Sequence, residues 1–350
     1  MDCETHQAVG RAGPAVQAGR RHGLLVFAFL ALATAAQAQT AIKLATIVPE
    51  GSVWDKNIKQ MAEEWKTATN GRVTVTVFAG NTQGDEPQIL RKMRVDALQA
   101  AAFTAVGLGS IDASFNVFDI PFFFESYDEL NYVTDKLTAE IRKRIEPKGF
   151  VLLNWGGGGW AQIFTKTPVQ TVDDLKRIKL YTSAGNDKMV QWFKANGFQP
   201  RAMAMTDIMT GLTTGMIDGM PSPPLGALMF QWYRQTPYML ELGLAPIIGA
   251  NVITTKTWKA IPEADKPKLL AAADAVEKRL RVEVPKMDES SVAMMTKNGL
   301  TVTKATGPEW KTQLDGLAKT MRGDMVPPDV FDLAVKARDE FRKQKSQQKK

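Results

Sequence analysis

The sequence predicts a two-domain α/β protein in which strands and helices alternate along most of the chain. The first observation is the stretch 173–224, where short β-type runs alternate with short helical runs. The second is a similar alternation over 42–95, and the third is the glycine run Gly156–Gly159 between the two. Strand–helix–strand patterns with such short connections are typical of right-handed units in parallel sheets. We therefore expect two parallel sheets joined by a hinge, with the glycines as a flexible crossing.

The stretch 173–224 predicts two strand–helix units in succession. Lys179–Thr182 is expected to form a strand, and Asn186 or Asp187 can cap the helix after it. Gln199–Met203 predicts the next strand, and Thr206 is expected to cap the second helix.

Ligands of such sheets bind at the carboxyl ends of the strands. Tyr181–Ser183 and Met220–Ser222 fall at these positions. These two segments are therefore the first candidates for a binding site.

The first half predicts three capped helices. Ser52 is expected to start a helix that runs to about Thr69, Asp85 one that runs to about Val95, and Ser126 one that runs to Glu146. Asp85, Glu86 and Asn81 are expected on a loop that faces the cleft, although capping explains Asp85 equally well.

Two apolar segments of the first half are candidates for a pocket wall. Leu98–Val106 predicts a strand with Phe103 near its carboxyl end. Phe118–Phe124 is strongly aromatic, and such a run is core for most of its members.

The C-terminal third is predicted to be mostly helical. A helix is expected from about Glu263 to Asn298, with Pro285 inside it as a source of a kink. Leu300–Thr303 predicts a strand and Pro308–Arg322 a closing helix, followed by a C-terminal helix and basic tail over 326–350.

Residues 1–38 have the pattern of a signal peptide. A positive segment that contains Arg20 and Arg21 precedes the apolar run Gly23–Ala36, and Ala36-Gln37-Ala38 fits a signal-peptidase site. The alternative is an uncleaved anchor, but a membrane span needs about 20 apolar residues. We expect cleavage after Ala38 and a periplasmic protein.

The distribution of cysteine and histidine excludes several kinds of chemistry. The only cysteine is Cys3 and the only histidines are His6 and His22, all within the leader. The mature chain therefore has no disulfide, thiol nucleophile, histidine base or Cys/His metal site. An enzyme would need carboxylates, lysine or an oxygen-bound metal, and Asp218 would be its first candidate.

The formal net charge of +7 does not describe the folded body. The segment 342–350 contributes +5 and the leader +1, which leaves the body near neutral. A nucleic-acid-binding protein would carry clustered basic and aromatic residues on its body, so that class is excluded. The tail is expected to be a solvated end, with an anionic partner as the alternative.

Four separated segments resemble one family of binding proteins. DDLKRIKLYTS and GLTTGMIDGMPS are similar to the second-domain core of the DctP-type solute receptors of TRAP transporters, and GDEPQILRKMRVDALQAA and IPFFFESYDEL to their first domain. The similarity runs from about Ala41 to Phe341. It implies a non-catalytic two-domain periplasmic binding protein without a cofactor, whose long helix spans both domains and helps set hinge bending.

The resemblance also implies partners and boundaries. The protein would capture a small organic solute and deliver it to the small and large TRAP membrane subunits; a sensing receptor is the alternative. We expect domain I over 39–156 and 246–284, and domain II over 157–245 and 285–325. Asp218 has a structural place in this scheme.

The site departs from the family pattern. In the family, an arginine at the end of the strand grips the substrate carboxylate, and Tyr181 stands at that position here. A second family arginine aligns with Ala161 or Trp160, and a family asparagine with Ser222. A neutral side chain does not replace guanidinium in such a pair. Either another cation reaches the site, or the solute is less charged and more apolar or aromatic, and the aromatic residues nearby favour the second option. No residue is assigned as a metal ligand, and the sequence does not say whether a metal accompanies the solute. The candidate ligand-binding residues are Tyr181, Trp160, Thr182, Ser183, Ser222, Phe103 and Trp232.

Overall fold

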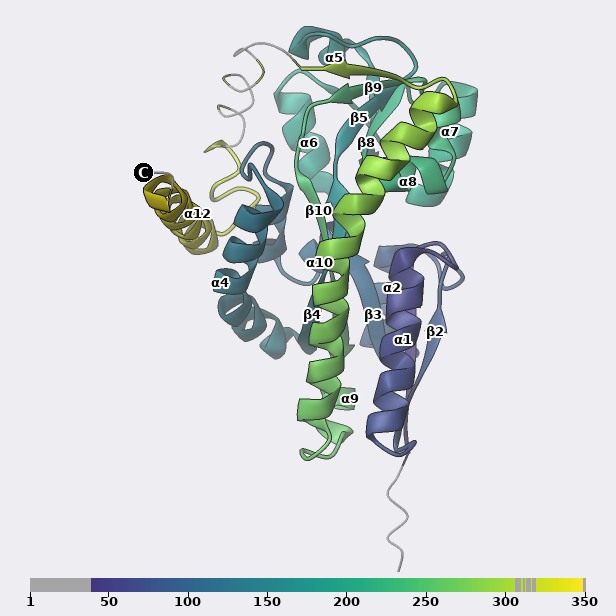
Figure 1. The fold of residues 1–350 in the computed structure, drawn as a ribbon, viewed down its shortest axis with the longest axis vertical. Helices are drawn as coiled ribbons and strands as arrows, with labels where there is room; N and C mark the ends of the chain where they lie inside the picture. The colour runs from purple at the N-terminus through teal and green to yellow at the C-terminus, as the bar shows by residue number, and fades with distance from the viewer. Residues whose placement is uncertain (1–38, 306–309, 311, 313–315, 317–318, 349–350) are drawn as a thin grey trace, which may run out of the picture. The chain divides into compact units, whose positions relative to one another are not determined.

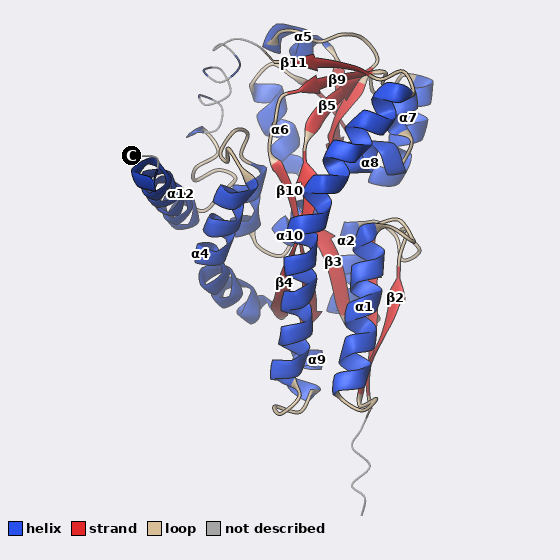
Figure 2. Cartoon of the chain, in the orientation of Figure 1, coloured by secondary structure: helices blue, strands red, loops and turns tan. Residues whose placement is uncertain are grey.

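The fold contains two mixed β-sheets with helices packed around them, seen in a computed structural model (Figures 1 and 2). The structure describes residues 39–348 except 306–309, 311, 313–315 and 317–318. The leader and part of the predicted helix Pro308–Arg322 lie outside these residues. Among the described residues, no helix is both long and apolar enough to cross a membrane.

The first sheet has the order β2-β1-β3-β10-β4. Its strands are β1 (Thr40–Thr46), β2 (Val73–Phe78), β3 (Ala100–Thr104), β4 (Phe150–Trp160) and β10 (Pro246–Thr254). β1 pairs in parallel with β2 and β3, whereas β10 is antiparallel to β3 and β4. The prediction of a wholly parallel sheet is therefore wrong here, because β10 returns from the second sheet against the direction of its neighbours.

The second sheet has the order β11-β9-β5-β8-β6-β7. Its strands are β5 (Gln162–Thr165), β6 (Lys179–Ser183), β7 (Gln199–Met203), β8 (Gly219–Ser222), β9 (Tyr238–Glu241) and β11 (Thr301–Lys304). The predicted unit β6-β7-β8 is parallel, but β5 is antiparallel to β8 and β9. We call the first sheet with its helices the first lobe, and the second sheet with its helices the second lobe.

The glycine run belongs to strand β4 and is not a separate flexible crossing. Gly156, Gly157 and Gly159 pair with β10. A Cβ atom on Gly158 would lie 2.7 Å from Ile247 Cγ2, and one on Gly159 would collide with the carboxylate of Asp288. The glycines therefore allow close approach within a paired strand, and the chain passes to the second sheet at Ala161.

Short-range signals correctly predict most helix starts. The N-cap residues are Ser52 for α1 (Val53–Ala68), Asp85 for α2 (Glu86–Arg94), Ser126 for α4 (Tyr127–Ile145) and Asn186 for α6 (Asp187–Ala195). In each helix the cap side chain accepts a hydrogen bond from a backbone N–H of the first turn. This bond satisfies one of the donors that a helix start leaves unpaired.

One prediction about a helix start in the second lobe is wrong. Thr206 does not cap α7 (Ile208–Thr214), because the 3₁₀ helix η3 (Met205–Asp207) leads directly into it. The next helix is short: α8 (Pro224–Met229) has Phe230 as its C-cap, and Gln231 has a positive φ of 59°.

The long helix α10 (Lys266–Lys297) contributes to the cores of both lobes (Figure 1). Val276, Leu280 and Val284 pack in a cluster with β1 and α1, whereas Met295 packs with Phe164 of β5. The helix continues through Pro285. One element thus spans the two lobes, as the family resemblance implies.

The basic segment at the C-terminus is helical as far as Gln348, not a disordered end. It continues α12 (Pro328–Gln348), which packs against α4 (Figure 1). Arg342 forms an ion pair of 2.8 Å with Glu129, which is buried. At least part of the tail charge is therefore used within the fold.

Candidate functional site

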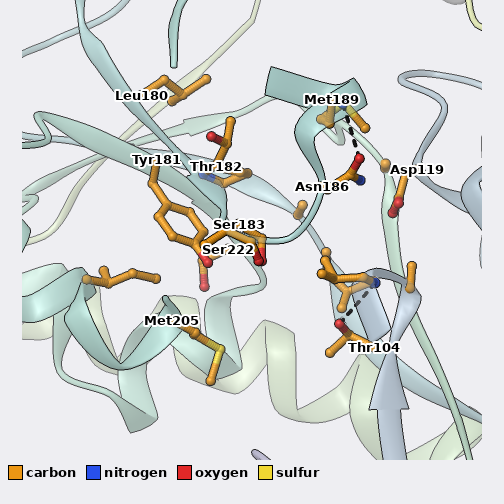
Figure 3. A pocket seen from close by; sticks show the side chains of 18 of the residues that line it. Thr104, Asp119, Leu180, Tyr181, Thr182, Ser183, Asn186, Met189, Met205 and Ser222 are labelled. Carbon is orange, nitrogen blue, oxygen red and sulfur yellow. Dashed lines mark hydrogen bonds between the residues drawn. The ribbon is translucent and has the colours of Figure 1, made fainter. Parts of the chain in front are cut away.

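A cavity of about 290 Å³ lies at the carboxyl ends of strands from both sheets (Figure 3). Thr104 at the end of β3 and Glu86 of α2 line it from the first lobe. Tyr181 and Ser222, at the ends of β6 and β8, line it from the second lobe. This is the edge at which parallel α/β sheets bind ligands.

Tyr181 supplies a ring and a hydroxyl to the cavity. It stands at the carboxyl end of β6 and points into the cavity, between Leu180 and Thr182, which also belong to the lining. Burial raises the pKa of Tyr181 to about 12. The side chain is therefore neutral near pH 7 and can offer one uncharged hydrogen bond.

Two hydroxyls beside Tyr181 differ in their hydrogen bonding. Thr182 Oγ1 is buried and has no hydrogen-bond partner among the described residues. Ser222 Oγ donates to the carbonyl of Pro223 at 2.9 Å. Since buried polar atoms are normally paired, Thr182 is the hydroxyl more available to a ligand.

The wall from the first lobe is acidic. Glu86 accepts hydrogen bonds from Thr104 N, Thr104 Oγ1 and Gly107 N. Burial raises the pKa of Glu86, and these three bonds oppose the rise. Asp85 caps α2 through Gln88 N, as its position in the sequence suggests. Both carboxylates therefore have structural partners.

Asp119 is a third carboxylate on this wall, and it has no such partner. Only burial and the charge of Glu86 act on its side chain, no described residue forms a hydrogen bond or ion pair with it, and it lines the cavity in Figure 3. Burial and the charge of Glu86 raise the pKa of Asp119 to about 7. Asp119 is thus a half-buried acceptor at the cavity wall that no described side chain or backbone group engages.

The described lining contains no lysine, arginine or histidine. Ala161 lies at the cavity where the resemblance allows a second arginine, and Tyr181 replaces the first. Within the same residues, no three acidic, histidine or cysteine side chains converge as a metal site would require. The electrostatic character of the cavity is therefore set by carboxylates and neutral groups.

Aromatic and thioether side chains cover the remaining wall. Trp192 and Phe193 reach the cavity from α6, Trp232 from the segment after α8, and Met189 and Met205 lie nearby. The rings of Trp192 and Phe193 meet edge to face at 5.3 Å. Such surfaces favour an apolar or ring-bearing ligand.

Five of the seven candidate residues line the cavity: Tyr181, Thr182, Ser183, Ser222 and Trp232. Phe103 does not, because it faces the first-lobe core with 2% of its surface exposed while the next residue, Thr104, faces the cavity. Trp160 is also elsewhere, packed edge to face on Tyr127 at 5.3 Å beside a second hollow.

Asp218, the candidate carboxylate of an enzyme, is outside the cavity lining. It accepts a hydrogen bond from Lys179 N at 3.1 Å and lies 3.7 Å from Lys179 Nζ. These bonds join the start of β6 to the turn before β8. Its role is to hold two strands together.

Sequence reasoning missed Asp119, Trp192 and Phe193 as site residues. The sequence places Trp192 and Phe193 on the buried face of a helix, and that face also forms the cavity wall. Asp119 is the only charged residue between Phe115 and Phe124. The sequence signal that could have identified Asp119 is a lone carboxylate within an aromatic run.

Comparison with known proteins identifies the class. Residues 44–323 match bacterial extracellular solute-binding protein family 7, the DctP family. The match covers most of the chain, so the protein belongs to this family. Its members bind solutes, and the two-lobed cavity described above is consistent with that activity.

Individual relatives are distant. The C4-dicarboxylate-binding periplasmic protein DctP of Rhodobacter capsulatus is 27% identical over 237 residues, which are 67% of this chain and 71% of the relative. A TRAP periplasmic solute-binding protein of Desulfovibrio salexigens, solved with orotic acid, superposes with a TM-score of 0.81 at 15% identity, covering 86% of this chain and 99% of that one. A protein of Xanthobacter autotrophicus Py2, solved with β-D-galacturonate, gives 0.79 at 20% identity, with 85% and 99% covered. At these identities the solved structures show the fold alone.

Proposed function

We propose that this protein is exported, loses residues 1–38, and captures a small solute that it hands to the membrane subunits of a TRAP transporter. The family and the cavity between the lobes support this role. We further propose that the solute carries no net negative charge and has an apolar or ring-bearing body.

The observation that carries the second proposal is the charge of the cavity wall. Asp85, Glu86 and Asp119 line it, and no described cationic side chain does. A carboxylate enclosed there would lose its hydration without gaining a positive partner. Leaving a charge buried and unpaired costs several kcal/mol, which corresponds to a loss of affinity of at least about 1000-fold.

The ligands of the solved relatives do not transfer to this chain, because the sequence identities are too low. Galacturonate and orotic acid are the ligands of the two solved relatives. Tyr181 stands where the resemblance places one arginine, and Ala161 or Trp160 stands where it places a second. None of these side chains can form a bidentate ion pair with a carboxylate. The aromatic wall formed by Trp192, Phe193 and Trp232 would instead contact a hydrophobic surface.

A thermal-shift screen tests the proposal. The chain 39–350 is unfolded and refolded to release any bound solute, then mixed with organic acids, aromatic acids, and neutral or cationic aromatic compounds. A ligand that binds the folded state raises the melting temperature by mass action. We expect stabilisation by compounds without net negative charge. Stabilisation confined to the acids would refute the proposed solute class.

A further inference from the structure

We propose that Asp119 is the specificity-determining residue of the cavity and that it binds a protonated nitrogen of the solute. The inference rests on the proposed function, because it takes the cavity as the solute site. It narrows the solute class from compounds without net negative charge to organic amines or related cations with an apolar body.

The position of Asp119 is fixed by its neighbours in sequence. It is the last residue of the 3₁₀ helix η1 (Ala113–Asp119), between Phe118 and Ile120, which are fully buried. Phe118 packs edge to face on Trp155 at 5.3 Å. The backbone on both sides is therefore anchored in the first-lobe core, and the carboxylate is presented on a rigid support.

The side chain of Asp119 reaches the cavity from the wall that faces Tyr181. In Figure 3, Asp119 and the ring of Tyr181 lie on different sides of the cavity, Asp119 on the segment from the first lobe and Tyr181 on β6 of the second. A solute that contacts Asp119 at one end can therefore place its apolar body against Tyr181. The cavity thus offers a carboxylate on one wall and an aromatic ring with neutral hydroxyls on the other, and these different groups would orient a ligand.

Asp119 has acceptor capacity that the protein itself does not use. The other two wall carboxylates are engaged, Glu86 with Thr104 and Gly107 and Asp85 with Gln88. No described group donates to Asp119. A carboxylate that lines the cavity and receives no donor from the described protein has its oxygens open to a ligand, and a bound cation with N–H groups would form charge-assisted hydrogen bonds with it.

The elements packed against η1 do not supply a cationic side chain that pairs with Asp119. The elements packed against it are α3 (Ala105–Gly109), β10 and α12. The first two contain no charged residue. In α12, Arg342 pairs with Glu129, and Arg338 lies over the Phe123 ring at 4.6 Å. The nearby Glu86 only adds negative potential.

The test compares compounds that share a carbon body and differ in the head group. Three triplets are used: 2-phenylethylamine, 2-phenylethanol and phenylacetate; benzylamine, benzyl alcohol and benzoate; and the corresponding cyclohexylmethyl compounds. Each is titrated into the refolded wild-type protein and into Asp119→Asn by thermal shift, and the hits by calorimetry. The matched control is Asp173→Asn, the same change at an exposed residue outside the cavity.

We expect the amine of at least one triplet to bind best. Asp119→Asn should weaken that amine at least tenfold and leave the alcohol within threefold, while Asp173→Asn should change neither. Equal binding of amine and alcohol, with Asp119→Asn harmless, overturns the inference but leaves the proposed function standing. Preferred binding of the carboxylates overturns both. Failure of every amine to bind also overturns the inference.

A measurement on the wild type covers the case in which Asp119→Asn does not fold. The amines keep their proton between pH 6 and 8, so the pH dependence of their binding reports the protein. Because the pKa of Asp119 is raised to about 7, amine affinity should increase about tenfold over this range. A flat or falling profile contradicts the assignment.

Discussion

Replacing Asp119 by asparagine should make the unliganded protein more stable at neutral pH than the wild type. Burial raises the pKa of this carboxyl group from its ordinary value of 3.8 to about 7 in the fold. Between these values the folded state binds more protons than the unfolded state. Stability from this group is therefore largest below pH 4 and is lost as pH rises towards 7.

The magnitude follows from the shift. Each pKa unit corresponds to about 1.4 kcal/mol, so the wild type should lose about 2 kcal/mol relative to Asp119→Asn between pH 5 and pH 7. Asparagine keeps the shape of the side chain and does not titrate. The difference between the two proteins isolates this group from the other carboxylates.

The assay is urea unfolding of both refolded, ligand-free proteins at pH 5, 6, 7 and 8. The free energy of unfolding is obtained by linear extrapolation, with equal slopes required for the comparison. Asp173→Asn serves as the exposed control. A difference between Asp119→Asn and wild type that does not change with pH would refute the reasoning, because it would mean that Asp119 is not held in an unfavourable environment.

Three further predictions concern ligand binding, packing and export. Tyr181→Phe should weaken solute binding by about 1 kcal/mol, the net value of one neutral hydrogen bond, and Tyr181→Arg should shift preference towards carboxylates; calorimetry checks both, and unchanged selectivity of the arginine variant would count against the site. Gly159→Ala should destabilise the fold by about 1–3 kcal/mol in urea unfolding, because the residue has a φ of +103° and its Cβ would meet Asp288; an effect no larger than that of an exposed substitution would show that the strand adapts. Mass spectrometry of the periplasmic protein should find Gln39 as the first residue, and retention of the apolar leader segment would disprove cleavage after Ala38.

Local signals predicted the parts of the fold that depend on neighbouring residues. Ser52, Asp85 and Asn186 cap their helices because a cap needs only the first turn that follows it. Tyr181 lies in the cavity, as predicted, because strand ends in α/β sheets meet at one edge. In these cases the chemistry of a few adjacent residues determines the outcome.

The misplaced residues depended on strand register and tertiary packing. Phe103 and Thr104 are adjacent, and successive strand side chains face opposite sides, so the register alone decides which of them lines the cavity. Trp160 was expected after a loop, but β4 continues through the glycines and turns the ring towards Tyr127. No local sequence pattern specifies which way Phe103 faces or that Trp160 packs against Tyr127.

Asp119 could not be assigned from its segment because its surroundings come from distant parts of the chain. Glu86 contributes the charge that acts on it, and Tyr181 forms the opposite wall. Sequence showed only a carboxylate among aromatic residues. The absence of a cation among the described residues of the lining is a property of the assembled cavity.

Calorimetric titration with the acids of the solved relatives tests whether the cavity rejects anionic solutes. The refolded wild type and Tyr181→Arg are titrated with D-galacturonate and orotate, and with the best compound from the screen. We predict that the wild type binds the screened compound but neither acid more tightly than about 1 mM, since no described cation lines the cavity. A dissociation constant in the micromolar range for either acid on the wild type would contradict this prediction.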